Sequence, residues 1–170
     1  MKLEPRSSAP AQARIPAAAR ISASPEATER LGAALASAIE EGDVIALSGA
    51  LGAGKTCFVT GVARGLSAKT RVRSPSFTLV NEYRGRVLLL HLDLYRIEPM
   101  DAGALGLEEQ RERGALVVEW GEKLPGPLLE EALRIAFEVG IGDTRVLSAD
   151  AESGRGLALL EAWRTLALES

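Results

Sequence analysis

The sequence contains very little cysteine and histidine, with one residue of each among 170, and only 4% of its residues are aromatic. The single cysteine, Cys57, cannot form an internal disulfide, so we expect a cytoplasmic protein in a reducing compartment. A catalytic thiol is not favoured, because the single histidine, His91, would have to act as its base. We interpret His91 as a structural residue.

Long apolar runs and a strong excess of one charge are also missing. No stretch approaches the roughly 18 consecutive apolar residues of a transmembrane helix, so we expect no membrane span and no membrane partner. The net charge of −3 and the pI near 5.4 argue against a protein that coats nucleic acid through bulk electrostatics. Four basic residues between Arg64 and Arg73 are interpreted as a solvated face, with a local basic binding patch as the alternative.

The length and the composition predict one α/β domain, because 170 residues with 46% hydrophobic content can bury one core. Residues 1–24 are rich in Ala, Pro, Ser and Arg and have no continuous apolar segment. We therefore expect a disordered N-terminal lead there rather than a secretory signal. The domain is expected to span residues 25–170.

The most informative segment is Gly49-Ala50-Leu51-Gly52-Ala53-Gly54-Lys55-Thr56, which matches the phosphate-binding loop pattern Gly-x-x-x-x-Gly-Lys-Thr. A β-rich run over 43–48 precedes it and a helical pattern over 57–66 follows it, as this loop requires. Its glycines let backbone N–H groups turn toward phosphate oxygens, and the helix N-terminus adds partial positive charge. Lys55 is expected to reach the β- and γ-phosphates, and the Thr56 hydroxyl to bind Mg²⁺. The segment predicts a nucleoside triphosphate site.

The rest of the pattern predicts a P-loop NTPase fold of three layers, with a mixed, mainly parallel sheet flanked by helices. An N-cap residue followed by apolar residues at helical spacing predicts a first helix over 25–41. Arg84-Gly85-Arg86 suits a hairpin turn between two strands. Strands are expected over 77–83, 87–93, 115–118, 133–139 and 145–148. Further helices are expected over 105–113 and 157–168, with a loop over 121–128 and a flexible segment over 153–156.

Two acidic residues are placed to complete the site. Asp93 and Glu119 each follow an apolar strand, and the carboxyl ends of such strands face the ligand crevice. Hydrolysis needs a held magnesium ion and a positioned water, and these carboxylates could supply both. Trp120 is expected to pack as a core or lid residue, with contact to the loop or the nucleotide as the alternative.

Four segments of the sequence form an ordered set, namely residues 49–58, Ser74-Pro75-Ser76-Phe77-Thr78-Leu79-Val80, His91-Leu92-Asp93-Leu94-Tyr95-Arg96 and Val118-Glu119-Trp120. Together they closely resemble the TsaE (formerly YjeE) family of small bacterial ATPases, over about residues 24–146. The resemblance implies a role in making threonylcarbamoyladenosine at position 37 of tRNAs that read codons beginning with A. It implies TsaB and TsaD as partners, with tRNA reached indirectly through the complex, and ATP hydrolysis that resets the complex between turnovers.

The resemblance also assigns roles to individual residues. Lys55 would hold phosphate and act in catalysis with Asp93, while Thr56 and Glu119 would bind Mg²⁺. Thr28 would lie near the base. The ATP-binding set implied in this way is Gly49, Leu51, Gly52, Ala53, Gly54, Lys55, Thr56, Cys57 and Thr28, and the switch loop that senses the γ-phosphate includes Ser74, Ser76 and Thr78. The chain departs from the family pattern at Ala50, Cys57, Ser76 and Gly121, where the family usually has Asp, Thr, Thr and Pro.

Two other functions fit a phosphate loop. A small-molecule kinase would use arginines such as Arg96, Arg111 and Arg113 in a lid, but the segment over 94–114 is mainly acidic and suits a protein interface better. A GTP-driven switch is disfavoured, because the sequence has no Asn-Lys-x-Asp motif for guanine. The kinase stays the alternative to the ATPase.

Overall fold

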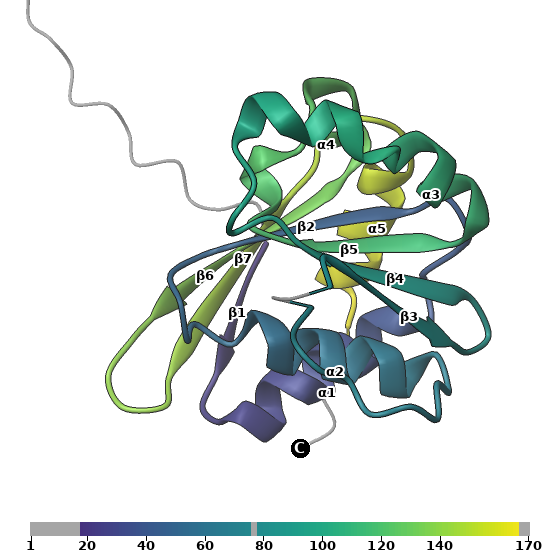
Figure 1. The fold of residues 1–170 in the computed structure, drawn as a ribbon. Coiled ribbons are helices and arrows are strands. Elements are labelled where there is room, and N and C mark those ends of the chain that lie inside the picture. The colour runs from purple at the N-terminus through teal and green to yellow at the C-terminus, as the bar shows by residue number, and fades with distance from the viewer. Residues whose placement is uncertain (1–17, 76–77, 167–170) are drawn as a thin grey trace, which may run out of the picture.

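The computed structural model describes residues 18–75 and 78–166, and Figure 1 shows its fold. One seven-stranded sheet has the order β1-β7-β6-β2-β5-β4-β3. Its strands are β1 Ala18–Ser22, β2 Val44–Ser48, β3 Val80–Arg84, β4 Leu88–Asp93, β5 Ala115–Glu119, β6 Leu133–Val139 and β7 Arg145–Asp150. The α-helices are α1 Pro25–Ala36, α2 Lys55–Gly65, α3 Leu107–Arg113, α4 Gly126–Glu131 and α5 Gly154–Arg164, and two 3₁₀ helices, η1 Pro99–Leu105 and η2 Gly121–Lys123, complete the set.

The sheet is mixed, as the sequence predicts. The four central strands β6, β2, β5 and β4 are parallel, whereas β3, β7 and β1 pair antiparallel at the two edges. In the parallel register Glu119 lies opposite both Leu47 and Asp93. The carboxyl ends of β2, β4 and β5 therefore meet at one edge, where the phosphate loop leaves β2.

Alternating side chains of β2 divide the core into the two layers that flank the sheet. Ile45 and Leu47 pack with α1, α2 and α5, and Val44 and Ala46 pack with residues of α3 and α4 on the other face. Figure 1 shows α1 and α2 below the sheet and α3 and α4 above it. Because helices cover both faces, the central strands β2, β4 and β5 have nearly continuous apolar sequences. The three-layer P-loop fold expected from the sequence is confirmed.

Strand β1 corrects the prediction that the whole segment 1–24 is disordered. Residues Ala18–Ser22 pair antiparallel with β7, and the indole Nε1 of Trp163 donates to the carbonyl of Ala18 at 3.2 Å. The Arg20 guanidinium donates to the carbonyls of Trp163 and Arg164 at the end of α5. These contacts come from distant parts of the chain, so the local composition could not indicate them. Residues 1–17 lie outside the described part.

Helix α1 is shorter than predicted, because it ends at Ala36 rather than near residue 41. The carbonyls of Ala36 and Ile39 accept hydrogen bonds from the Arg86 guanidinium, and that of Ala38 accepts one from Arg155. Two arginines from later in the chain thus donate to the carbonyls at and just beyond the end of α1, in the place of backbone N–H groups from a further helical turn. Ile39 still packs in the core, which explains the apolar pattern that suggested a longer helix.

Two segments expected to be irregular contain helix. Gly126–Glu131 forms α4, which buries Leu128 against the sheet, and α5 begins at Gly154 inside the segment predicted to be flexible. Glycine is required at position 156, because a Cβ there would lie 2.5 Å from the carbonyl oxygen of Ala132. The glycines that suggested flexibility therefore serve close packing between α4 and α5.

Candidate functional site

The loop between β2 and α2 has the backbone that its glycines suggest. Gly54 caps α2 with φ of +105°, and Gly49 has φ of +139°. A Cβ at Gly49 would lie 2.6 Å from the carbonyl oxygen of Phe137, so β6 leaves no room for a side chain. Left-handed backbone and this close approach both require glycine. The loop therefore curves tightly at the N-terminus of α2, where backbone N–H groups and the helix dipole favour an anion.

Lys55 is the first residue of α2 and is almost fully buried, with 6% of its surface exposed. Its Nζ donates to the carbonyls of Gly49 and Ala50, and it lies 4.4 Å from the centre of the Trp120 ring. Burial lowers the pKa of Lys55, although the nearby carboxylates, Glu119 first, act in the opposite direction. The amine is thus held inside the loop by acceptors that a phosphate could replace.

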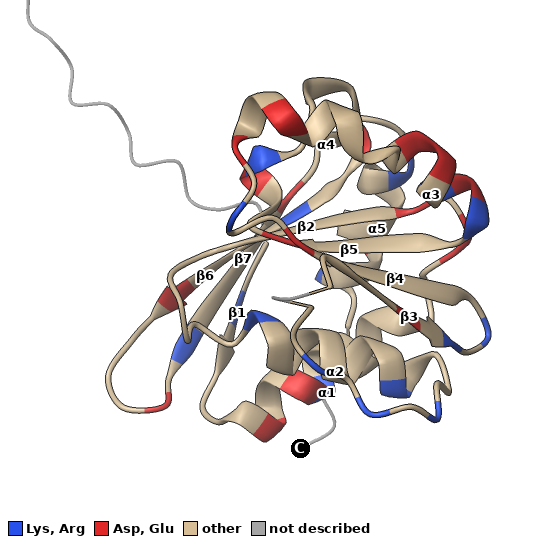
Figure 2. Ribbon diagram, viewed as in Figure 1, with Lys and Arg blue, Asp and Glu red and all other residues tan. Residues whose placement is uncertain are grey.

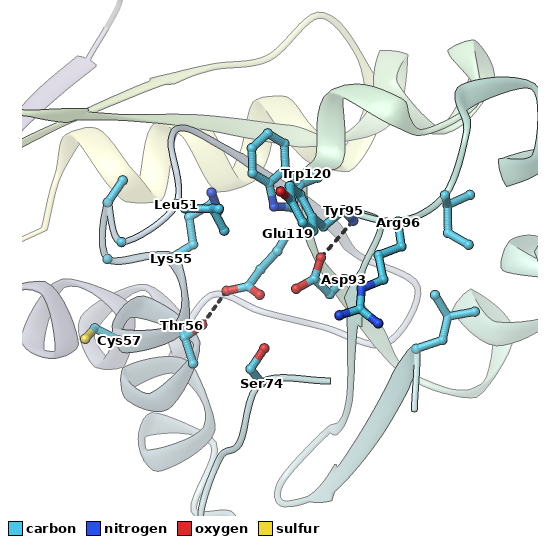
Figure 3. Close-up of a pocket in the computed structure, with 15 residues that line it drawn as sticks. Leu51, Lys55, Thr56, Cys57, Ser74, Asp93, Tyr95, Arg96, Glu119 and Trp120 are labelled. Carbon is cyan, nitrogen blue, oxygen red and sulfur yellow. Dashed lines mark hydrogen bonds between the residues drawn. The ribbon is translucent and has the colours of Figure 1, made fainter. Parts of the chain in front are cut away.

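Thr56 and Glu119 meet across the site although they are far apart in the sequence. The Thr56 hydroxyl donates to Oε1 of Glu119 at 2.7 Å, as Figure 3 shows. Glu119 ends β5 and is 3% exposed. Burial raises its pKa, but the adjacent His91 ring, the hydrogen bond from Thr56 and the charge of Lys55 outweigh this effect, so that the pKa is lowered overall. Glu119 is therefore a carboxylate at neutral pH.

Asp93 ends the neighbouring strand β4 and lies in register with Glu119. Its Oδ1 accepts the backbone N–H of Tyr95 at 2.8 Å. Burial raises the pKa of Asp93, and the Glu119 carboxylate raises it further. Two adjacent carboxyl groups with pKa values shifted in opposite directions are an arrangement suited to acid and base roles. Figure 3 shows both side chains directed into one cavity, with Thr56 and Ser74 nearby.

This cavity has a volume of about 640 Å³. It is lined by Leu51, Gly52, Ala53, Gly54, Lys55, Thr56, Cys57, Ser74, Leu79, Asp93, Tyr95, Arg96, Ile97, Glu119 and Trp120. The structure thus brings the phosphate loop, both acids and the first residue of the predicted switch loop around one space. A volume of this size can hold a small organic ligand.

A further part of the cavity wall is built by Tyr95, Arg96, Ile97 and Trp120, from the segments that directly follow the two acids. The sequence assigned no role to Tyr95 and Ile97 and considered Arg96 only for the lid of a kinase. The ring centre of Trp120 lies 4.4 Å from Nζ of Lys55, which agrees with the alternative that Trp120 contacts the loop. The rings of Tyr95 and Trp120 lie 5.1 Å apart, and Trp120 adopts a left-handed backbone with φ of +58°. The signal in the sequence that could have identified these wall residues is their position just after the carboxyl ends of β4 and β5. Residues at this position face the same crevice as the two acids.

Several predicted site residues lie outside the lining of the cavity. Thr28 is buried beside Gly54, and its hydroxyl shares a hydrogen bond of 2.8 Å with that of Ser22. The Thr78 hydroxyl donates to Asn81 at 2.8 Å, on the exposed side of the hairpin. Gly49 contributes only its carbonyl to Lys55. Ser76 lies outside the described residues.

Metal-binding capacity in the described residues is limited to small sets of ligands. Within 18–75 and 78–166, no group of three or more His, Cys, Asp or Glu side chains could enclose a metal. The oxygens of Thr56 and Glu119 remain, and Mg²⁺ needs few protein ligands because it keeps most of its waters. No helix in the described part of the chain is long and apolar enough to cross a membrane.

A family model described as threonylcarbamoyl adenosine biosynthesis protein TsaE matches residues 22–146, which include the loop and both acids. The chain belongs to the TsaE family. Proteins of this family take part in the biosynthesis of threonylcarbamoyladenosine in tRNA. The resemblance noted from the four sequence segments is therefore confirmed.

Individual TsaE relatives match over most of their length. The chain is 41% identical over 121 residues to the tRNA threonylcarbamoyladenosine biosynthesis protein TsaE of Treponema pallidum, which covers 70% of this chain and 90% of that protein. It is 38% identical over 139 residues to TsaE of Bacillus subtilis, with coverage of 81% and 87%. The crystal structure of Bacillus subtilis YdiB superposes with a TM-score of 0.71 at 34% identity, covering 86% of this chain and 93% of that one.

Proposed function

We propose that this TsaE-family chain is a cytoplasmic ATPase that acts with the TsaB and TsaD pair to form threonylcarbamoyladenosine at position 37 of tRNAs reading codons beginning with A. Its hydrolysis of ATP resets the transferase complex between turnovers, and tRNA is reached through the complex. The observation that carries the proposal is the contact between Thr56 and Glu119 directly beside a lysine-bearing phosphate loop. A buried carboxylate beside the Thr56 hydroxyl is a place for the Mg²⁺ that accompanies a triphosphate on such a loop.

The residues of the site fit ATP with Mg²⁺. The oxygens Oγ1 of Thr56 and Oε1 of Glu119 lie 2.7 Å apart, close to the roughly 2.9 Å between neighbouring ligands of an octahedral magnesium ion. The loop amides and Lys55 would hold the phosphates. Mg²⁺ would neutralise charge that develops on the phosphate oxygens.

The carboxyl group of Asp93 is the candidate to orient the attacking water. It reaches the same cavity, and its raised pKa brings it closer to neutral pH than an exposed aspartate. Ser74 lines the cavity on the side of the predicted switch loop, which supports a role for this loop in sensing the γ-phosphate. Phosphoryl transfer depends mainly on such positioning and on charge stabilisation.

The test is phosphate release from ATP by the chain alone and with purified TsaB and TsaD, with Lys55→Ala as the blank. We expect slow release by the chain alone and clear stimulation by the pair. Lys55→Ala should lose tight triphosphate binding and release no phosphate above background, because the amine no longer reaches the phosphates.

Two outcomes would contradict the proposal. If the pair does not stimulate release and phosphate appears on an added small metabolite, the chain is a small-molecule kinase. If GTP competes as well as ATP, or if Lys55→Ala still binds triphosphate, the assigned nucleotide or the assigned loop is wrong.

A further inference from the structure

His91 is a fully buried polar residue that the proposed mechanism does not use. It lies on β4 two residues before Asp93, so both side chains point to the same face of the sheet. Its Nε2 is 3.6 Å from Oε2 of Glu119, and neither ring nitrogen has a hydrogen-bond partner among the described residues. Buried polar side chains almost always have a partner, so this one needs an explanation.

Packing alone does not explain an imidazole at this place. The ring centre of His91 lies 6.2 Å from that of Tyr83, and its neighbours Leu89 and Val117 belong to the apolar core. An aliphatic side chain would fill the same volume without removing two polar nitrogens from water. The polar group that the fold brings to Nε2 is the carboxylate of Glu119.

The two oxygens of Glu119 have different neighbours. Oε1 accepts from the Thr56 hydroxyl, and Oε2 faces His91. The terminal torsion of a glutamate is broad, so one contact does not fix the rotation of the carboxylate, whereas contacts on both oxygens do. A shift of about half an ångström would bring Nε2 and Oε2 to ordinary hydrogen-bond distance.

We propose that His91 is a positioning residue whose Nε2–H group donates to Oε2 of Glu119 and turns Oε1 toward Thr56 and the cavity. The donor is present in the neutral tautomer with the proton on Nε2 and in the doubly protonated ring, so the role does not depend on the charge of His91. Outer contacts of this kind fix the orientation of metal-binding carboxylates. The functional consequence rests on the proposed function, because it concerns the Mg²⁺ that Glu119 would hold.

The first test measures how much Mg²⁺ increases the affinity for a non-hydrolysable ATP analogue, by calorimetry with Mg²⁺ and with EDTA. His91→Leu removes the donor, and we expect it to reduce the gain from Mg²⁺ by about tenfold or more while leaving the affinity in EDTA unchanged. His91→Gln can place an amide N–H at the position of Nε2 and should keep most of the gain. His91→Asn places its amide at the position of Nδ1 and should behave like His91→Leu.

Melting temperatures of the three variants separate positioning from packing. If all three variants lose affinity with and without Mg²⁺ in proportion to a lower melting temperature, His91 is only a core residue and the inference is overturned. A folded His91→Leu protein that keeps the full gain from Mg²⁺ would overturn it as well. If Mg²⁺ does not increase the affinity of the unmodified protein for the ATP analogue, the proposed function fails instead.

The second test needs no nucleotide. Because His91 is the only histidine in the chain, long-range ¹H–¹⁵N spectra of the untagged protein contain the signals of a single imidazole. We expect a protonated Nε2 whose ¹⁵N shift changes in Glu119→Gln and stays constant in Glu112→Gln, an exposed residue of α3. An Nε2 signal that is the same in Glu119→Gln, or a proton on Nδ1 alone, would overturn the inference whether or not the chain hydrolyses ATP.

Discussion

At the residue scale, the site depends on two carboxyl groups that share one edge of the sheet. Glu119 is held ionised by His91, Thr56 and Lys55, while burial and the charge of Glu119 raise the pKa of Asp93. Like charges this close cannot both ionise at their ordinary pKa values, so the folded chain keeps an unfavourable interaction here. Such interactions are typical of functional sites rather than of stable cores.

Glu119→Gln tests the role of the ionised carboxylate. The amide keeps the size of the side chain but loses the charge beside Thr56. We therefore expect triphosphate binding in EDTA within about threefold of the original, a gain in affinity from Mg²⁺ that is at least about tenfold smaller, and phosphate release at least about tenfold slower. Single-turnover phosphate release and calorimetric binding with Mg²⁺ and with EDTA measure these effects separately. Glu112→Gln is the matched control, and an undiminished rate in Glu119→Gln would remove Glu119 from the mechanism.

Asp93→Asn should stabilise the protein at neutral pH while it impairs hydrolysis. Because the pKa of Asp93 is raised in the folded state, its ionisation reduces stability as the pH rises through that raised value. We expect the variant to melt about one or two degrees higher at pH 7–8, a small effect because the side chain is partly exposed and screened by solvent.

The difference in melting temperature should narrow as the pH falls through the raised pKa of Asp93 and disappear below 3.8, the ordinary pKa of this group, because Asp93 is then protonated in both the folded and the unfolded chain. Thermal scans across pH, with the exposed Asp143→Asn as control, check this result. A lower melting temperature for Asp93→Asn at pH 8 would contradict the prediction.

At the element scale, α2 is both the phosphate-binding helix and one half of a close helix pair. A Cβ at Gly61 would lie 1.9 Å from the carbonyl oxygen of Glu29, and one at Gly32 would lie 2.2 Å from that of Phe58. Glycines thus bring the backbones of α1 and α2 together without intervening side chains. The position of α2, and with it the direction of the loop, depends on this contact.

Gly61→Ala should push α1 away from α2. We expect the free energy of unfolding to fall by about 1–3 kcal/mol, as for other overpacked cores, and the affinity for triphosphate to weaken because the start of α2 shifts. Urea denaturation and calorimetric binding measure the two effects. Gly103→Ala is the matched control, because a Cβ there has no neighbour within 4 Å; equal stability of the two variants would contradict the prediction.

The element scale also shows which predictions from the sequence were accurate. The loop, the hairpin of β3 and β4 and the antiparallel pair β6 and β7 follow from turn residues and alternation within a few residues. The end of α1, the strand β1 and the helix α4 did not follow, because arginine contacts, an edge pairing and burial against the sheet decide them. Local propensity is weak compared with such tertiary contacts.

At the scale of the whole molecule, the C-terminal helix is joined to the entry of the nucleotide-binding strand. Arg155 on α5 donates from Nε to Oδ1 of Asp43 at 2.8 Å and from a terminal nitrogen to Oδ2 at 2.9 Å. Asp43 is fully buried and directly precedes β2. A two-point contact between a guanidinium and a buried carboxylate fixes the position of both segments.

Arg155→Met should therefore destabilise the whole domain. It leaves the buried Asp43 carboxylate without its charged partner, and we expect a loss of about 1–3 kcal/mol in the free energy of unfolding, measured by urea denaturation. The double variant Asp43→Asn/Arg155→Met should recover part of this loss, because no buried charge remains unpaired. A double variant less stable than Arg155→Met would show that the ion pair is not the cause.

Charge is distributed unevenly over the molecule. Figure 2 shows acidic residues concentrated on α3 and α4 above the sheet and basic residues around the far ends of α2 and the β3–β4 hairpin. The acidic side includes the segment expected from the sequence to suit a protein interface. The basic residues at the far end of α2 include Arg64, which pairs with Glu29 of α1 at 2.9 Å. This agrees with the interpretation of these basic residues as a solvated face.

The sequence by itself determined the phosphate loop and the fold class, because both depend on residues that are adjacent or regularly spaced. Gly49 to Thr56 set their own backbone conformation, and apolar runs ending in Asp93 and Glu119 mark the strands that face the loop. Tertiary structure alone decided which side chains meet. It brought Thr56 to Glu119, placed Tyr95 and Trp120 together in the cavity wall and set His91 against Glu119. These contacts depend on strand order and register between residues that are 25 or more positions apart in the sequence.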